Sequence, residues 1–414
     1  MIKTAYFIVL AIIIVNTGCK KPYNPPAIST TNSYLVVEGV ISTSSDSTII
    51  KLSNTVQLSS ATTTNPVLNA LVDVESDQGT VFPLTETGSG HYASPGLNLD
   101  NSRKYRLSIK TNNEQYYSDY VAVLNSPPID SVYFTTTNNG INIYSNAHDP
   151  TNTVKYYRWE YQETWIYHSN YYSFYKSNGD SVIPRNFIND EVYQCWRSDT
   201  SSTINVASSA NLKTDIISAN PITFVASTSE KLGAKYSIVN TQSAGSSNAY
   251  SIMVKQYALT GEAYTFWSNL KKNTEKLGSI FDAQPSQING NIHSSTHPTE
   301  PVIGYISAGA VTSKRIFIKN QQIPDTWEPT PLYTGCHLDT LFLSYSDASS
   351  TVPVNQEDEY FNWNSGLLLF KNRQIPVVGI FNRLTGAIVG HSGSTPPCVD
   401  CTLRGTNVQP AYWK

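Results

Sequence analysis

Short runs of β-branched and aromatic residues, separated by clusters of Ser, Asp, Asn and Gly, constrain the fold of this chain most. Between residues 34 and 123 they include YLVVEGVIS, STIIKLS, ALVDVES and YYSDYVAV. In KYRLSIK, the apolar Tyr105, Leu107 and Ile109 alternate with polar residues, and this period of two is typical of a half-buried strand. We therefore expect a β-sandwich at the start of the folded chain.

The domain organisation follows from the same runs. Their order, with a tight hairpin signal at Asp77-Gln78-Gly79, resembles a transthyretin-like module, so we assign a transthyretin- or Ig-like β-sandwich to residues 34–125. The prolines at 127 and 128 interrupt strand pairing and mark a boundary. Residues 126–414 continue the β patterns, and we expect them to form a larger β-rich domain, which makes the chain mainly β.

One amphipathic helix is predicted over residues 260–281. Thr260 is a plausible N-cap, and Glu262 stands in the first turn, where a carboxylate is favourable. The apolar residues at steps of three and four are Ala263, Tyr264, Trp267, Leu270, Leu277 and Phe281. This spacing gives one apolar stripe, and we expect the helix to lie across a sheet and to close its open edge or end.

The N-terminal segment predicts export. A single cation, Lys3, precedes an apolar run that is too short to span a bilayer, and the run ends in Gly18-Cys19. We assign residues 1–18 to a lipoprotein signal peptide, Cys19 to lipidation, and the Pro/Ser/Thr/Asn-rich residues 19–33 to a lipid-anchored tether. The alternatives are an uncleaved anchor or an ordinary secretory signal with an incidental cysteine.

Charge excludes one class of partner. The chain carries 28 Lys and Arg against 31 Asp and Glu, a formal net charge of −3. Charged residues make up 14% of the chain, and they form no basic stripe. A nucleic-acid partner is therefore not expected.

The cysteines beyond the lipidation site predict disulfides. There are four of them: Cys195, Cys336, Cys398 and Cys401. An even number in an exported protein favours disulfides that tie the C-terminal tail to the body, and four cysteines allow three pairings, which stay open here. The C-x-x-C of the tail leaves three alternatives: a zinc site with the distant thiols or His337, a redox motif, and free or partly paired thiols. A second zinc knuckle is missing, and the motif sits in a proline-rich tail instead of at a helix N-terminus in a βαβ setting.

A search for catalytic motifs predicts no enzyme, no cofactor and no metal site. GHSGS at 390–394 resembles a nucleophile elbow, but Ser394 stands where glycine is required and the surroundings have a β pattern. GSGHY at 88–92 precedes a strand, so a hairpin turn is favoured over a phosphate cradle. His293 and His297 are interpreted as parts of a polar loop, and Glu357-Asp358-Glu359 as a solvated turn.

One segment is unusually aromatic: YYRWEYQETWIYHSNYYSFYK at 156–176. Aromatic platforms bind sugars or peptides by stacking and also occur at protein interfaces. The candidate ligand or partner surface consists of Tyr157, Trp159, Trp165, Tyr171 and Tyr172. The alternative, which we favour, is a pair of strands in which the aromatic residues 157, 159 and 161 pack into a core while residues 156, 158 and 160 face water.

Several motifs together resemble a family. KPYNPPAI after Cys19, YLVVEGVI, PPIDSV, VIGYISA and the terminal CVDCTLRGTNVQPAYW are similar to Bacteroidota outer-membrane lipoproteins of domain-of-unknown-function family 4249. The resemblance implies a lipid anchor in the outer membrane, with the periplasmic or cell-surface face open. It also implies an accessory role beside a TonB-dependent outer-membrane barrel. It supplies no catalytic residues.

Two classes of function follow. The first is a non-enzymatic binding or accessory lipoprotein that works with a TonB-dependent transporter and takes a small-molecule, peptide or glycan ligand that the sequence does not specify. The second is a structural or adhesive protein of the cell envelope. A large aromatic-lined cleft would favour ligand capture, whereas an exposed apolar patch would favour docking.

Overall fold

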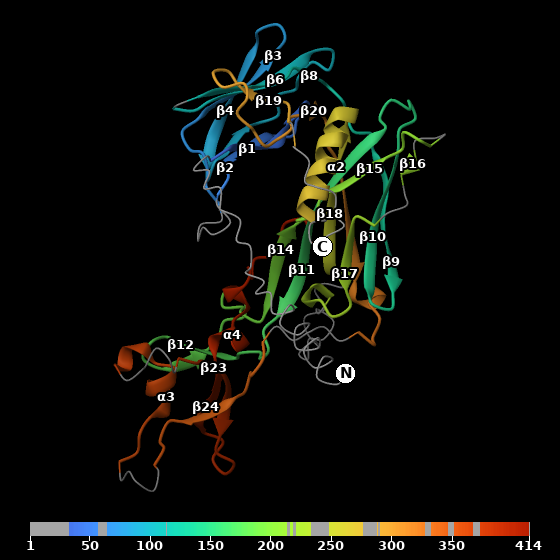
Figure 1. Ribbon diagram of the computed structural model, residues 1–414. Coiled ribbons are helices and arrows are strands. Elements are labelled where there is room, and N and C mark those ends of the chain that lie inside the picture. Colours follow the sequence, from blue (N-terminus) through green and yellow to red (C-terminus); the bar gives the residue numbers. More distant parts are fainter. Residues whose placement is uncertain are drawn as a thin grey trace, which may run out of the picture.

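The computed structural model describes residues 33–56, 64–112, 114–212, 216–217, 221–232, 248–275, 288, 290–327, 333–346, 352–366 and 373–413. The predicted signal peptide, the lipidation site Cys19 and the predicted tether up to residue 32 lie outside these residues. The described chain is mainly β, as predicted, and its strands form three modules (Figure 1). Within the described part of the chain, none of the helices has the length and apolarity needed to cross a bilayer.

The N-terminal module is a ten-stranded sheet that encloses one core. Its strands are β1 (Leu35–Ser42), β2 (Thr48–Asn54), β3 (Leu71–Ser76), β4 (Val81–Gly88), β5 (His91–Ser94), β6 (Lys104–Lys110), β7 (Gln115–Ser118), β8 (Val121–Ala122), β19 (Ile292–Ser294) and β20 (Ala308–Gly309). Tyr105, Leu107 and Ile109 of β6 are buried in this core, which confirms the predicted alternation. Leu35 of β1 belongs to the same core, so the two halves of the sheet face each other.

The predicted boundary at residue 125 is incomplete, because the chain returns to this module. β19 pairs antiparallel with β7, and β20 pairs parallel with β1. The N–H of Leu124 also donates to the carbonyl of Ala308 at 2.9 Å, which joins the two sides of the module. A segment of the expected second domain therefore completes the first one.

The middle module is a second sandwich. One sheet contains β9 (Ile129–Thr137), β10 (Gly140–His148), β16 (Ile216–Ile217) and β17 (Thr223–Ala226). The other contains β11 (Tyr156–His168), β14 (Gln194–Thr200), β15 (Asn205–Ser208), β18 (Asn248–Leu259) and β21 (Thr312–Lys319). Ile141 and Ile143 of the first sheet share a core with Ile252 and Val254 of the second. The two sheets therefore pack face to face.

Helix α2 (Gly261–Glu275) lies against the β11, β15 and β18 sheet (Figure 1). The hydroxyl of Thr260 accepts a hydrogen bond from the N–H of Ala263 at 3.2 Å, which confirms the predicted N-cap. Ala263 and Phe266 are buried. The helix covers the outer face of the sheet instead of closing its edge, and the predicted Leu277 and Phe281 lie outside the described residues.

The third module is small and was not expected, because residues 126–414 were predicted to form one domain. Its elements are β12 (Tyr175–Ser177), β13 (Val182–Pro184), β22 (Asp339–Phe342), α3 (Gln356–Tyr360), η3 (Trp363–Ser365), β23 (Ile375–Phe381), β24 (Ile388–Ser394) and α4 (Pro396–Val399). It combines an insertion between β11 and β14 with a C-terminal segment, which meet where the N–H of Phe174 donates to the carbonyl of Val377 at 2.8 Å. Figure 1 shows it at the end opposite the N-terminal module.

Candidate functional site

The aromatic segment lies mostly in strand β11, and its first half is core. Tyr157, Trp159 and Trp165 are buried in the middle sandwich, so the prediction that they form a ligand or partner surface is wrong. The physical reason is position, because β11 is an inner strand between β14 and β15 on one side and β18 on the other. Residues 157, 159 and 165 share one face of that strand, which points to the facing sheet.

The opposite face of β11 is only partly open to water: the Glu160 side chain is 41% exposed and Tyr156 is half-buried. Arg158 was expected to face water, yet it is buried beneath α2. Its guanidinium lies 4.3 Å from the ring centre of Tyr257 and 4.2 Å from that of Trp267. It also donates to the carboxylate of Glu160 at 2.5 Å. Arg158 therefore stands in an aromatic cage that joins the sheet to the helix.

Glu160 completes this cage electrostatically. Burial acts to raise the pKa of Glu160, but the charge of Arg158 and the hydroxyl of Tyr257 outweigh it, so the pKa lies below its usual value. Burial and the charge of Glu160 raise the pKa of Tyr257. The carboxylate thus stays ionised beside Arg158, and the phenol stays protonated and donates to Glu160 at 2.7 Å.

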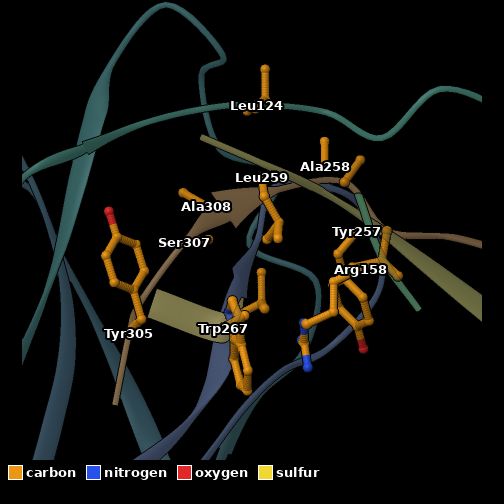
Figure 2. Close-up of a pocket in the computed structure, with 13 residues that line it drawn as sticks. Leu124, Arg158, Tyr257, Ala258, Leu259, Trp267, Tyr305, Ser307 and Ala308 are labelled. Carbon is orange, nitrogen blue, oxygen red and sulfur yellow. The ribbon is translucent and has the colours of Figure 1, made fainter. Parts of the chain in front are cut away.

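A small cavity lies beside the Arg158 cage (Figure 2). Val40 and Ala308 line it from the N-terminal module, and Trp267 lines it from α2. In the view of Figure 2, Tyr305 lies on the other side of Trp267 from Arg158 and Tyr257. The cavity volume is about 10 Å³, which is room for about one water molecule. The cage is therefore a joint between modules and not a ligand pocket.

A wider depression lies on the middle module. Its volume is about 730 Å³, and it is open to solvent. Hydroxyl side chains dominate its lining, with Thr136 and Thr137 on one side and Ser227 and Thr228 on the other. Trp327 also lines it but is buried in the core, so it offers little stacking surface. The depression is not the aromatic-lined cleft that would favour ligand capture.

The cysteines form two disulfides, as predicted, and the pairing that sequence left open is now resolved. Cys195 pairs with Cys401, and Cys336 pairs with Cys398. The two cysteines of the C-x-x-C therefore have different partners: one lies on β14 of the middle sandwich and the other in the third module. Because all four thiols are used, the zinc and redox alternatives are wrong.

The C-terminal tail lies along the middle sandwich beyond these disulfides. The N–H of Trp196 donates to the carbonyl of Thr406 at 2.8 Å. The guanidinium of Arg315 lies 3.7 Å from the ring centre of Tyr412, and Trp413 is buried in the core. The tail is therefore part of the sandwich, and it holds the third module in place.

Tyr171 and Tyr172, the other two residues of the predicted surface, are half-buried. Tyr171 packs beside the Cys336–Cys398 disulfide in the core of the third module. Tyr172 contacts three aromatic rings, those of Phe174 at 4.9 Å, Phe187 at 5.6 Å and Tyr193 at 5.1 Å between centres. Phe174 and Phe187 are exposed, so a partner surface around Tyr172 stays a prediction.

His168 should make the fold sensitive to acid. Burial lowers its pKa to about 4, and only the hydrogen bond to Gln194 opposes this. In the unfolded chain the pKa is about 6.5, so as the pH falls from there toward 4 the unfolded state takes up a proton first. The free energy of unfolding therefore falls by up to about 3 kcal/mol over this pH range. We expect His168→Gln to remove this loss in urea unfolding at pH 7 and pH 4.5.

The control for this prediction is His337→Gln, because the His337 side chain is exposed. That variant should keep the pH dependence of the parent protein. An unchanged pH dependence in His168→Gln would show that other groups govern the acid response.

The two glycine-rich motifs are structural, as predicted. GHSGS at 390–394 lies within strand β24 and not in a strand-to-helix turn. GSGHY forms the turn between β4 and β5, where Gly88, Ser89 and Gly90 all have positive φ. GHSGS therefore lacks the geometry of a nucleophile elbow, and GSGHY is the hairpin turn that was favoured over a phosphate cradle.

The acidic run at 357–359 differs from its prediction as a solvated turn. Glu357 and His391 are both buried, and the Nδ1 of His391 lies 2.7 Å from a carboxylate oxygen of Glu357. The ring of His391 contacts Tyr175 with 4.4 Å between centres. Within the described residues, its Nε2 has no hydrogen-bond partner. The pair holds α3 against β24.

The far end of the third module exposes a cluster of large apolar side chains, which we call the distal apolar patch. It consists of Leu343, Tyr345, Val354, Phe381, Leu384 and Ile388. Phe381 pairs with Ile388 across the β23–β24 hairpin, and the N–H of Leu343 donates to the carbonyl of Val389. The register therefore gathers these residues at one end of the sheet. Leu384, in the hairpin turn, is 97% exposed.

The sequence contained a signal for this patch that our predictions did not use. Turn residues are normally polar, yet Leu384 stands between Asn382 and Gly386. The side chain of Asn382 accepts hydrogen bonds from the N–H groups of Leu384 and Thr385, so the turn is an ordinary one. An apolar residue at the tip of such a turn is free to contact a partner.

Comparison with known proteins identifies the family. The family model described as Domain of unknown function (DUF4249) matches residues 20–315. The chain belongs to this family. The family match therefore covers the N-terminal module, most of the middle module and the β12–β13 insertion, and it ends within β21, so the CVDCTLRGTNVQPAYW tail lies beyond it. A comparison with curated proteins found no match.

A solved structure gives only a weak likeness. A two-domain fibronectin type III segment of chicken tenascin is 10% identical, with 56% of this chain and 93% of that chain covered and a TM-score of 0.15. At that score the likeness carries no argument. The assignment of the fold as mainly β rests on the strands and their pairing.

Proposed function

We propose that this protein is an outer-membrane lipoprotein without catalysis of its own, which docks onto a TonB-dependent barrel as an accessory component. The observation that carries the proposal is the distal apolar patch. Scattered exposed apolar residues are ordinary on soluble proteins, but a cluster at one end of a module marks an interaction site.

The chemistry of the patch favours a protein partner. The segments that carry it, residues 343–346, 352–355 and 381–388, contain a single charged residue, Arg383. An apolar centre with few charges is typical of the core of a protein interface, whereas a surface that binds anionic lipid needs a basic cluster. The barrel itself is suggested by the family resemblance.

The anchor supports the same arrangement. If Cys19 carries the lipid, 13 residues lie between it and Ser33, the first described residue. A chain of that length reaches at most about 50 Å, which keeps the N-terminal module near the membrane. The distal apolar patch lies on the module farthest from that attachment point (Figure 1). The patch is therefore held away from the anchor, where it would meet the parts of a barrel that project from the bilayer.

A second function is favoured by one observation, the arrangement of the modules in series (Figure 1). The first two modules meet at the Arg158 cage. The Cys195–Cys401 disulfide ties the tail that follows the third module to the middle sandwich. A stiff row of modules suits a structural or adhesive envelope protein that spaces other components. In that function the distal patch would bind a component other than a transporter.

The test is purification of the lipidated full-length protein from its native outer membrane in mild detergent, through a tag on a flexible linker after Lys414. We expect a stoichiometric TonB-dependent barrel to copurify. In Phe381→Ser/Leu384→Ser the amount of barrel should fall about tenfold or more, because buried apolar anchors dominate interface energies. Both side chains are exposed, so the variant should fold normally.

The matched control is Leu71→Ser, which removes an exposed apolar residue from the N-terminal module. It should leave the barrel bound. If the protein emerges alone even after crosslinking, or if both variants retain the barrel equally, the accessory function is wrong and the structural function becomes the better explanation. Binding of the parent protein to protein-free lipid vesicles, lost in the patch variant, would instead assign the patch to the bilayer.

A further inference from the structure

The edge of the N-terminal sheet brings together three side chains, from distant parts of the chain, of the types that commonly bind metal ions. Ser294 of β19 pairs with Tyr116 of β7, and the N–H of Ser295 donates to the carbonyl of Gln115 at 2.8 Å. This pairing lays the turn that follows β19 against Glu114. The turn is closed by the N–H of Glu300, which donates to the carbonyl of His297 at 2.9 Å.

The ligand atoms converge. Glu114, His297 and Glu300 each offer one ligand atom, and these atoms all lie within 4.8 Å of one another. Two carboxylates and one imidazole form a donor set that suits zinc and related divalent transition metals. Glu114 lies 183 residues before His297 in the sequence, which explains why our search for local motifs interpreted this turn as a polar loop.

The carboxylate of Glu114 is already oriented. The hydroxyls of Ser294 and Thr296 both donate to its Oε1, the former at 2.8 Å. Its Oε2 lies 3.1 Å from the Nδ1 of His297. Oε1 is thus held by two hydroxyls, as outer-shell partners hold metal ligands, while Oε2 lies within hydrogen-bond distance of the imidazole.

We infer that Glu114, His297 and Glu300 form a site for a divalent transition metal of the zinc class. With three protein ligands, a water or a group from a partner completes the coordination. The metal would clamp the returning segment around β19 onto the N-terminal module. It is independent of the proposed docking function, because the distal apolar patch lies on another module.

His293 offers a matched control. It precedes His297 by four residues, is exposed, and lies 3.6 Å from Asp119 instead of facing the three ligands. A surface that bound metal through scattered histidines would depend on both residues. Of these two histidines, the site inferred here depends only on His297.

The experiment uses the full-length protein in mild detergent after removal of metal with EDTA. Zinc added alone in titration calorimetry should bind with one equivalent and raise the Tm, and cobalt(II) should show d–d absorption bands typical of a low-coordinate site. His297→Ala and Glu300→Gln should each weaken zinc binding by about 100-fold, and Ser294→Ala by about tenfold. His293→Ala should bind as the parent does.

Each alternative result overturns the inference. No zinc binding by the parent would exclude the site. Equal weakening by His293→Ala and His297→Ala would show nonspecific surface binding. Unchanged binding in His297→Ala/Glu300→Gln would place the metal elsewhere. Because His297 is exposed, His297→Ala should fold normally. Unfolding of the metal-free variant and of the metal-free parent should therefore give the same stability.

Discussion

Replacing Cys195 and Cys401 together by alanine is expected to lower the free energy of unfolding by about 4 to 5 kcal/mol. The disulfide between them closes a loop with a sequence separation of 206, and the constraint on the unfolded chain grows with the length of the loop. Both residues are fully buried, so alanine also removes packing from the core. Urea unfolding followed by tryptophan fluorescence measures the loss, because Trp159 and Trp196 lie in the same core.

The other disulfide provides the comparison. Cys336 and Cys398 have a sequence separation of 62, and their replacement by alanine should cost about 4 kcal/mol. The loss of stability should be confined to the third module. Limited proteolysis should therefore cut the third module while the middle sandwich stays intact. A loss below about 1 kcal/mol for the Cys195 and Cys401 pair would mean that the tail is held by its noncovalent contacts alone.

The features that could be predicted from the sequence are those that depend on residues close together in the chain. The alternation of Tyr105, Leu107 and Ile109 sets which side of a strand is apolar, and Thr260 caps a helix through the N–H of a residue three positions later. Disulfides could be expected from the number of cysteines, but their pairing could not. Pairing depends on which strand lies beside the tail, and that is decided by the whole sandwich.

The domain boundary could not be predicted for a related reason. β19 and β20 are very short, and Ile292–Ser294 carries no pattern that identifies β7 as its partner. Its place is set by the path of the chain through the middle module. The candidate metal site depends on the same pairing, so Glu114 and His297 could not be connected by reading the sequence alone.

The aromatic segment shows the limit of periodicity at a site. A period of two separates the face of Tyr157 from the face of Arg158, but it does not say what covers either face. The facing sheet covers Tyr157 and α2 covers Arg158, so both of these residues are buried. Leu384 is the opposite case, because its turn could be predicted while its exposure depends on what packs around the third module.

Replacing Glu357 by leucine is expected to destabilise the third module by up to about 3 kcal/mol, because it leaves the buried imidazole of His391 without its hydrogen-bond partner. Glu357 is 2% exposed, and its carboxylate faces the Nδ1 of His391 at 2.7 Å. The Nε2 of that imidazole already lacks a hydrogen-bond partner among the described residues, so the substitution leaves both ring nitrogens unsatisfied. Hydrogen exchange of the β22–β24 sheet measures the local loss.

The decisive comparison is Glu357→Leu/His391→Phe, which removes both polar groups and keeps apolar volume in the core. Replacing both partners of a buried hydrogen bond by apolar groups of similar shape can be nearly neutral in stability, whereas either single change leaves a buried polar group unpaired. We therefore expect the double variant to regain most of the stability that each single variant loses, with Glu359→Leu, in the same helix, as a control of small effect. If the losses of the two single variants simply add, the pair is not coupled, and the stability of α3 on β24 comes from apolar packing such as that of the buried Phe361.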